Sequence, residues 1–144
     1  MSAEEVRGFV AEKMVMQCAT IGPRGLAHMV PLWFVGDASE LRGWTYAKSQ
    51  KARNLERDAR ATLGLEDGVQ YHELRGVMFE CEVRMARDPK DVERVGLELF
   101  DRYAGELNDD IRAMVATQAP KRVGLTFVPT RTVSWDHRKL GGVY

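Results

Sequence analysis

The sequence has no excess of charge of either sign. Its 144 residues include 21 basic and 21 acidic side chains, so the formal net charge is zero. A neutral chain lacks the broad positive field that draws a protein to nucleic acid or to an anionic membrane. We therefore expect no nucleic acid and no membrane as partner, and any anion-binding site must be local.

Long apolar runs, cysteine and histidine are also scarce. The apolar stretches, such as residues 29–35 with Pro31 inside it, fall far short of the roughly 20 residues that a membrane-spanning helix needs. The first residues lack the basic and apolar regions of a secretory signal, so we expect a cytoplasmic protein. Cys18 and Cys81 lie in segments typical of buried strands, which favours buried thiols over a disulfide. Three scattered histidines form no metal-binding pattern.

Familiar catalytic motifs are missing as well. The chain contains no glycine fingerprint for dinucleotides, no phosphate-binding P-loop, no nucleophile elbow and no metal-binding motif. Hydrolysis and nucleoside-triphosphate chemistry therefore have no support. This pattern suits a protein in which a bound cofactor supplies the chemistry.

The order of apolar and turn-forming residues predicts an α+β protein that is mainly β. Helices are expected at residues 2–13, 48–58, 88–105 and 109–117. Strands are expected at residues 15–21, 26–35, 41–47, 61–66, 74–86, 122–128 and 130–136. Short turns with inserted helices favour an antiparallel barrel of six to seven strands over a parallel sheet. The length fits one domain, residues 1–144.

The junction between the third strand and the second helix carries an unusual set of charges. Ser49 suits the N-cap position, and Lys48 and Lys51 flank it. Cations at a helix N-terminus are unfavourable by roughly 0.3–1 kcal/mol each, because the helix dipole is positive there. A bound phosphate would explain them, with Asn54 on the same helical face as Lys51. The alternative is a solvated basic face that pairs with acidic residues of the same helix.

Two further segments suggest ligand contacts. Pro31 lies inside a predicted strand, which confines that strand to a sheet edge or a bulge. Its free backbone groups can then bond a planar heterocycle, although a plain barrel-edge proline is an equal alternative. Near the C-terminus, Trp135 stands beside a run of cations that ends at Lys139. This segment suits either the rim of a ligand site or a dimer contact.

Several motifs resemble one known family in their order and spacing. The segments are Val30-Pro31-Leu32-Trp33, Ser49-x-Lys51-x-x-Asn54-Leu55, Arg57-Asp58-x-Arg60, Tyr71-x-x-Leu74-Arg75-Gly76-Val77 and Trp135-Asp136. They are similar to those of the split-barrel flavin and deazaflavin oxidoreductases that include pyridoxamine 5'-phosphate oxidase. The Lys-x-x-Asn-Leu block and the Trp-Asp-x-x-Lys ending resemble the actinobacterial branch that uses the deazaflavin F420. The resemblance covers nearly the whole chain and implies an FMN-binding-like split β-barrel of Greek-key type.

The resemblance also implies a site between two subunits, and hence a homodimer. The residues it assigns to the cofactor are Lys51 and Asn54 for the phosphate, Ser49 and Lys48 as helpers, and the strand Val30, Pro31 and Leu32 beside the ring. The residues it assigns to the substrate side, from either subunit, are Tyr71, Trp135 and Arg138. Some F420-binding relatives have arginine where this chain has Ser49.

The expected activity is that of a reductase dependent on reduced F420. It would transfer a hydride to a conjugated or quinone-like small molecule. One alternative is an FMN-dependent oxidase or flavin reductase, and a second is a non-catalytic carrier of a cofactor or a haem-type ligand. No side chain is an obvious acid or base, so the sequence assigns no catalytic residue, and it does not identify the substrate.

Overall fold

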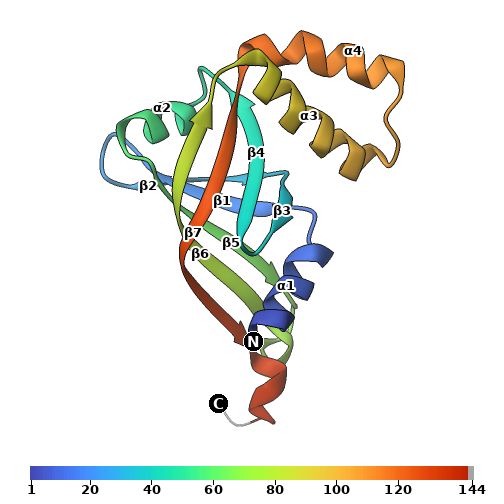
Figure 1. Cartoon of the computed structure of the whole chain (residues 1–144). Helices are drawn as coiled ribbons and strands as arrows, with labels where there is room; N and C mark the ends of the chain where they lie inside the picture. Colours follow the sequence, from blue (N-terminus) through green and yellow to red (C-terminus); the bar gives the residue numbers. More distant parts are fainter. Residues whose placement is uncertain (143–144) are drawn as a thin grey trace.

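The computed structural model describes residues 1–142, which form a strongly curled antiparallel sheet with helices around it (Figure 1). The seven strands are hydrogen-bonded in the order β2-β1-β5-β6-β7-β4-β3. Their bounds are β1 Met16–Ile21, β2 Ala27–Leu32, β3 Val35–Asp37, β4 Glu40–Tyr46, β5 Arg60–Asp67, β6 Arg75–Ala86 and β7 Arg122–Asp136. The fold confirms the predicted α+β, mainly β, split β-barrel. Val143 and Tyr144, the last residues of the predicted domain, lie outside the described part.

Alternating apolar residues of the strands fill the inside of the curled sheet. Along β5, for example, Ala61, Leu63 and Leu65 are buried, whereas the residues between them are only partly covered. This period of two is the one that a strand with one covered face requires. The largest completely buried side chains are Phe34, Phe79, Phe127, Met16, Leu41, Leu63, Leu65, Leu99 and Leu125. Cys18 and Cys81 also belong to this core, and both are free thiols as predicted.

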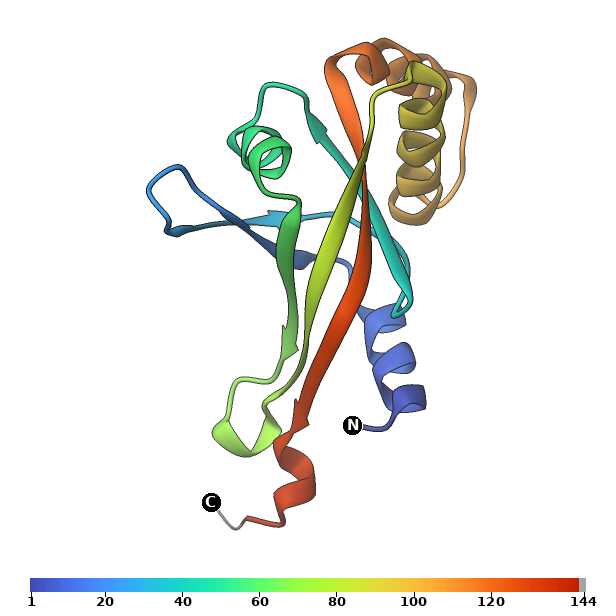
Figure 2. The same cartoon turned by 60° about the vertical axis from the view of Figure 1, so that its left-hand side comes forward.

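Helix α1 (Ala3–Glu12) packs against the sheet through Val6, Phe9 and Val10. Ser2 begins it with the capping box expected from the sequence, in which the Ser2 and Glu5 side chains each bond the other's backbone amide. Helix α2 (Gln50–Arg57) lies above the β1–β2 hairpin, which extends away from the other strands in Figure 2. The first helix is thus confirmed in place and in its cap.

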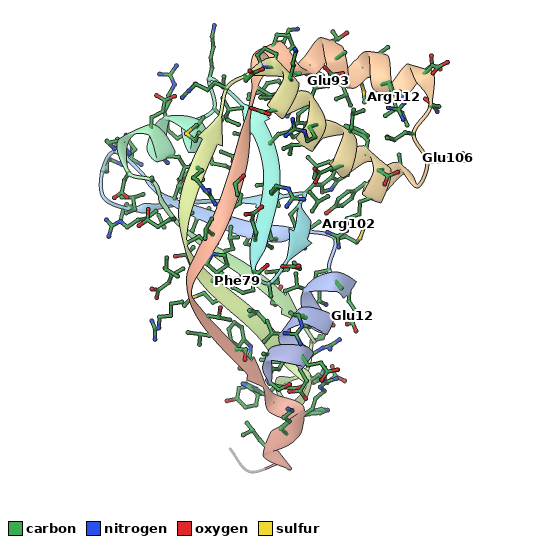
Figure 3. All side chains as sticks on the ribbon, viewed as in Figure 1. Glu12, Phe79, Glu93, Arg102, Glu106 and Arg112 are labelled. Carbon is green, nitrogen blue, oxygen red and sulfur yellow. The ribbon has the colours of Figure 1, made fainter. Side chains whose placement is uncertain are left out.

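Helix α3 (Pro89–Ala104) covers the outer side of the sheet near β4 and β7, and helix α4 (Asp109–Gln118) packs on α3. Gly96 makes this approach possible, because a Cβ atom there would lie 2.4 Å from the Trp44 ring. Near the C-terminal end of α3, Arg102 donates to the backbone oxygens of Phe34 and Lys13, both at 2.6 Å (Figure 3). Helix α3 is therefore held against the rest of the chain at its middle and near its C-terminal end.

Two predicted strand boundaries are wrong. The closing strands expected at 122–128 and 130–136 form one continuous strand, β7, because a bulge opposite Glu80 accommodates Pro129 and Thr130. The strand expected at 26–35 is instead divided into β2 and β3. No helix within residues 1–142 is long and apolar enough to cross a membrane.

Candidate functional site

The junction between β4 and α2 adopts the geometry expected of a helix cap. Ser49 is the N-cap, and its Oγ accepts the Ala52 amide at 3.1 Å and lies 3.2 Å from Thr45 Oγ1. The first turn of α2 contains no acidic residue. Because an α-helix cannot supply acceptors for its first N–H groups, the amides of Gln50 and Lys51 remain available to a ligand.

Lys51 is the most unusual side chain of this junction, because it is a buried cation. Only 6% of its surface is exposed. Its ammonium donates one long hydrogen bond, 3.4 Å to Thr45 Oγ1, and no carboxylate of the described residues forms an ion pair with it. Burial lowers the pKa of Lys51; Cys18 acts in the opposite direction, and the like charge of Arg122 lowers it further. A buried charge normally has a partner of opposite charge, and Lys51 has none among the described residues.

Asn54 lies on the same side of α2 as Lys51, as the sequence predicted, and it is completely buried. Its Nδ2 donates to Thr20 Oγ1 of β1 at 3.0 Å, and its Oδ1 accepts from Gln50 at 2.7 Å and from Arg57 at 3.2 Å. These bonds tie α2 to β1. Asn54 therefore holds the helix, and with it Lys51, in position.

Further cations gather where β4 ends and β7 begins. The Ala47 amide donates to the Lys121 carbonyl at 2.9 Å, and Tyr46 pairs with Arg122 in the β4–β7 register. We use the name basic cluster for Lys48, Lys51, Lys121 and Arg122. Within residues 1–142 none of these side chains forms an ion pair with a carboxylate. The cluster is thus a local anion-attracting surface on a neutral chain.

Beside the basic cluster lies a small pocket, which we call the aromatic pocket. Its volume is about 270 Å³. Its walls are Pro31, Leu32, Trp33, Trp44, Phe100 and Arg122. The Arg122 guanidinium lies over the Trp44 ring at 4.5 Å and over the Tyr46 ring at 4.1 Å. An apolar pocket lined by aromatic rings, with one cation at its wall, suits a planar ligand.

The strand that the sequence assigned to a heterocycle adjoins this pocket. β2 is an edge strand, as Pro31 predicted, and it pairs only with β1 among the described strands. Val30 and Leu32 are half-buried, whereas Pro31 is exposed. Two of the three predicted residues, Pro31 and Leu32, line the aromatic pocket.

The residues assigned to the substrate side belong to the short helix η1 (Tyr71–Glu73), the end of β7 and the short helix η3 (His137–Leu140), and these segments lie at the opposite end of the barrel from α2 (Figure 1). The Tyr71 ring lies 4.7 Å from that of His137. Trp135 covers Gly76, where a Cβ atom would be 2.3 Å from the indole ring. Arg138 is paired with Asp136 at 2.6 Å. Within one chain these residues do not meet the basic cluster.

Another groove, of about 300 Å³, lies between β1, β5 and β6. Glu80 and Glu82 contribute to its lining, together with Arg60. Carboxylates there oppose binding of a phosphate, which makes the basic cluster the better anion site.

Sequence reasoning missed Lys121 and Arg122, and it treated Trp44 only as a strand residue. The available signal was a pair of cations at the start of the last strand, directly after Pro120. Their proximity to α2 depends on the pairing of β4 with β7, which no local pattern reveals.

Comparison with known proteins agrees with this architecture. A family model described as pyridoxamine 5'-phosphate oxidase matches residues 2–136. A conserved hypothetical protein from Mycobacterium tuberculosis is 43% identical over 100% of this chain and 90% of its own, with a TM-score of 0.89. No curated protein matches the sequence.

More distant solved structures share the fold alone. An F420 reductase is 23% identical and has a TM-score of 0.71; the match covers 88% of this chain and 94% of that protein. A haem storage protein from Vibrio cholerae is 17% identical with a TM-score of 0.71, and the match covers 93% of each chain.

Proposed function

Because the chain belongs to the pyridoxamine 5'-phosphate oxidase family, we propose that it is an oxidoreductase that binds F420 and reduces a conjugated or quinone-like small molecule. The observation that carries the proposal is the buried, unpaired ammonium of Lys51. A family of cofactor-binding barrels and a cation without a partner together point to an anionic cofactor group at the start of α2.

The residues at this junction fit a phosphate. A phosphate at the start of α2 would accept from the Lys51 ammonium and from the free amides of Gln50 and Lys51, while the Ser49 hydroxyl holds the cap. The unfavourable burial of the ammonium would then be offset by charge-assisted hydrogen bonds. Lys48 and Lys121 add positive charge from the exposed side. Asn54 positions the helix for this contact through Thr20.

The cofactor ring would lie along β2. The unpaired edge of Val30, Pro31 and Leu32 offers backbone groups to the polar side of a heterocycle, and the aromatic pocket adjoins it. When bound, reduced F420 would supply a hydride, and one proton from the cofactor or from water would complete the reduction of the acceptor to its dihydro form. The protein positions the two rings and excludes water from between them.

The choice of F420 over FMN rests on the Lys51-x-x-Asn54-Leu55 block and on the Trp135-Asp136-x-x-Lys139 ending. The family description supports the alternative, an FMN-dependent oxidase or flavin reductase, for which the same phosphate site would serve. Oxygen distinguishes them, because reduced FMN reoxidises readily in air and reduced F420 does not.

We propose further that the enzyme is a homodimer in which the partner completes the site. Tyr71, Trp135 and Arg138 lie at the far end of the barrel from α2, so one chain alone does not bring them to the basic cluster. The corresponding residues of a second copy would supply the substrate side.

The test measures oxidation of reduced F420 through the return of the absorbance of oxidised F420. A panel of quinones and enones serves as acceptors. Turnover that is lost in Lys51→Met and reduced less in Lys48→Met, which removes an exposed cation beside the cap, supports the proposal. Turnover only with FMN and oxygen would make the protein an FMN enzyme. Tight cofactor or haem binding without any turnover would make it a carrier.

A further inference from the structure

Rigid neighbours hold the walls of the aromatic pocket in place. The Trp33 ring is stacked on Tyr103, with centroids 4.3 Å apart and an interplanar angle of 10°. The Tyr103 hydroxyl accepts from the Phe34 amide at 3.0 Å and donates to the Met14 carbonyl. Phe100 meets the rings of Trp33 and Trp44 edge-on, at 6.2 and 6.4 Å. The pocket is therefore preformed rather than a gap between mobile side chains.

Arg122 is the one charged group among the residues that line this pocket. Its Nε is buried and has no hydrogen-bond partner among the described residues. The rings of Trp44 and Tyr46 contact the face of the guanidinium, which leaves its N–H edge without an acceptor. Buried donors are nearly always satisfied in native proteins, so an unsatisfied one at a pocket wall indicates a missing partner. A guanidinium matches carboxylates and related anions with two parallel bonds.

We propose that the aromatic pocket binds the acceptor substrate, and that Arg122 selects acceptors carrying an anionic group, such as a carboxylate, on a small conjugated ring system. This inference rests on the proposed function, since it assigns the substrate class of the same site. Arg122 acts here as a specificity residue, and the aromatic walls provide the stacking surface.

The size and charge of the pocket support this assignment. A volume of about 270 Å³ lies just below the roughly 300–1,000 Å³ typical of ligand pockets, and it suits one or two fused rings rather than a whole cofactor. None of the lining residues is a carboxylate. Lys51 and Arg122 repel one another, so the placement of Arg122 is unfavourable without an anion.

The first test needs no cofactor. Calorimetric titration of the purified chain at neutral pH compares naphthalene carboxylate with the matching carboxamide, which has the same shape but no charge. The variants are Arg122→Gln, Arg122→Lys and the control Arg112→Gln, which removes an exposed arginine of α4 (Figure 3). Because a hydrogen bond to a charged group is worth roughly 1.5–3 kcal/mol, the carboxylate should bind on the order of tenfold or more tightly than the amide.

The expected result is that this preference disappears in Arg122→Gln, is partly kept in Arg122→Lys and is unchanged in Arg112→Gln. Equal binding of acid and amide by the wild-type chain overturns the proposal, whatever the stability of the variants. A preference that survives in Arg122→Gln overturns it too. Because this readout involves neither F420 nor FMN, a failure of this proposal can be distinguished from a failure of the proposed function.

A second test locates the anion on the acceptor rather than on the cofactor. The ratio of kcat/KM for a naphthoquinone sulfonate to that for the parent naphthoquinone is measured in the wild type and in Arg122→Gln, so that intrinsic reactivity cancels. A lower ratio in Arg122→Gln than in the wild type, with unchanged F420 affinity, supports the assignment. Loss of F420 affinity in Arg122→Gln, together with displacement of naphthalene carboxylate by F420, would assign the pocket to the cofactor and overturn it.

Discussion

Replacing Lys51 with methionine is expected to weaken cofactor binding without destabilising the protein. Methionine keeps the length and packing of the lysine stem but removes the ammonium. Only one hydrogen bond is lost, the 3.4 Å contact with Thr45, which is longer than the usual 2.7–3.2 Å range of such bonds. No ion pair with a described carboxylate is broken. The substitution should therefore weaken cofactor binding but stabilise the ligand-free protein.

The magnitudes follow from the burial of Lys51. Loss of a hydrogen bond to a charged phosphate should reduce the affinity by about 1.5–3 kcal/mol, which is roughly 10- to 150-fold in Kd. The ligand-free protein should gain up to about 1 kcal/mol, because a desolvated ammonium is removed from a site 6% exposed. For a chain of this length that corresponds to a rise in Tm of about 3–4 °C.

The stability gain should also depend on pH. The folded-state pKa of Lys51 is lowered from its ordinary value of 10.5, mainly by burial. The charged form is thus disfavoured in the folded state; its penalty is fully present at neutral pH, begins to fall as pH rises past the lowered folded-state pKa, and is gone above the ordinary value of 10.5. The stability difference between wild type and Lys51→Met should therefore shrink in alkaline solution.

The assay combines thermal unfolding of the ligand-free proteins with fluorescence titration of the cofactor, and Lys48→Met is the control. Lys48 is exposed, so its loss should leave stability unchanged and affect affinity less. A fall in Tm for Lys51→Met would show that the lysine is a structural residue. Unchanged affinity would place the phosphate elsewhere.

Three other substitutions test the structure around the site. Asn54→Ala should destabilise the protein by about 2 kcal/mol in urea unfolding, because the bond to Thr20 and the acceptor for Gln50 are lost; a change below that of an exposed-site control would refute its positioning role. Gly96→Ala should destabilise by about 1–3 kcal/mol, although Gly to Ala in a helix interior usually stabilises, because the new Cβ would lie 2.4 Å from the Trp44 ring; a higher Tm would contradict this packing. The pKa of Glu5 is lowered from 4.5 to about 2, chiefly by its hydrogen bond with Lys139. The contribution of Glu5 to folding stability is therefore complete above pH 4.5 and is lost as pH falls through about 2. The difference in Tm between wild type and Glu5→Gln should therefore close over that range, and a constant difference would exclude the ion pair as its cause.

The β4–α2 junction could be predicted because its chemistry is local. An N-cap serine, the absence of acids in the first turn and the position of Asn54 on the face of Lys51 all follow from residues within one helix. The edge position of β2 followed equally from a single proline.

What could not be predicted depends on contacts between distant segments. The approach of Arg122 to Tyr46 arises from strand register, and the burial of Lys51 depends on how α2 packs against β1. The continuity of β7 through Pro129 depends on a bulge in its pairing with β6; a proline is compatible with either a bulge or a break, and only the register with the distant strand β6 distinguishes the two. The separation of Tyr71, Trp135 and Arg138 from the basic cluster likewise appears only in three dimensions, and their substrate role stays a prediction.

The most direct test of the central claim is an equilibrium titration of the wild-type protein and of Lys51→Met with F420 and, separately, with FMN at matched salt. We predict saturable binding of F420 at micromolar concentrations, weaker binding of FMN, and a loss of roughly tenfold or more in the variant. Absence of saturable binding of either cofactor, or binding that Lys51→Met leaves unchanged, would contradict a cofactor phosphate at Lys51. A preference for FMN would retain the site and reject the F420 assignment.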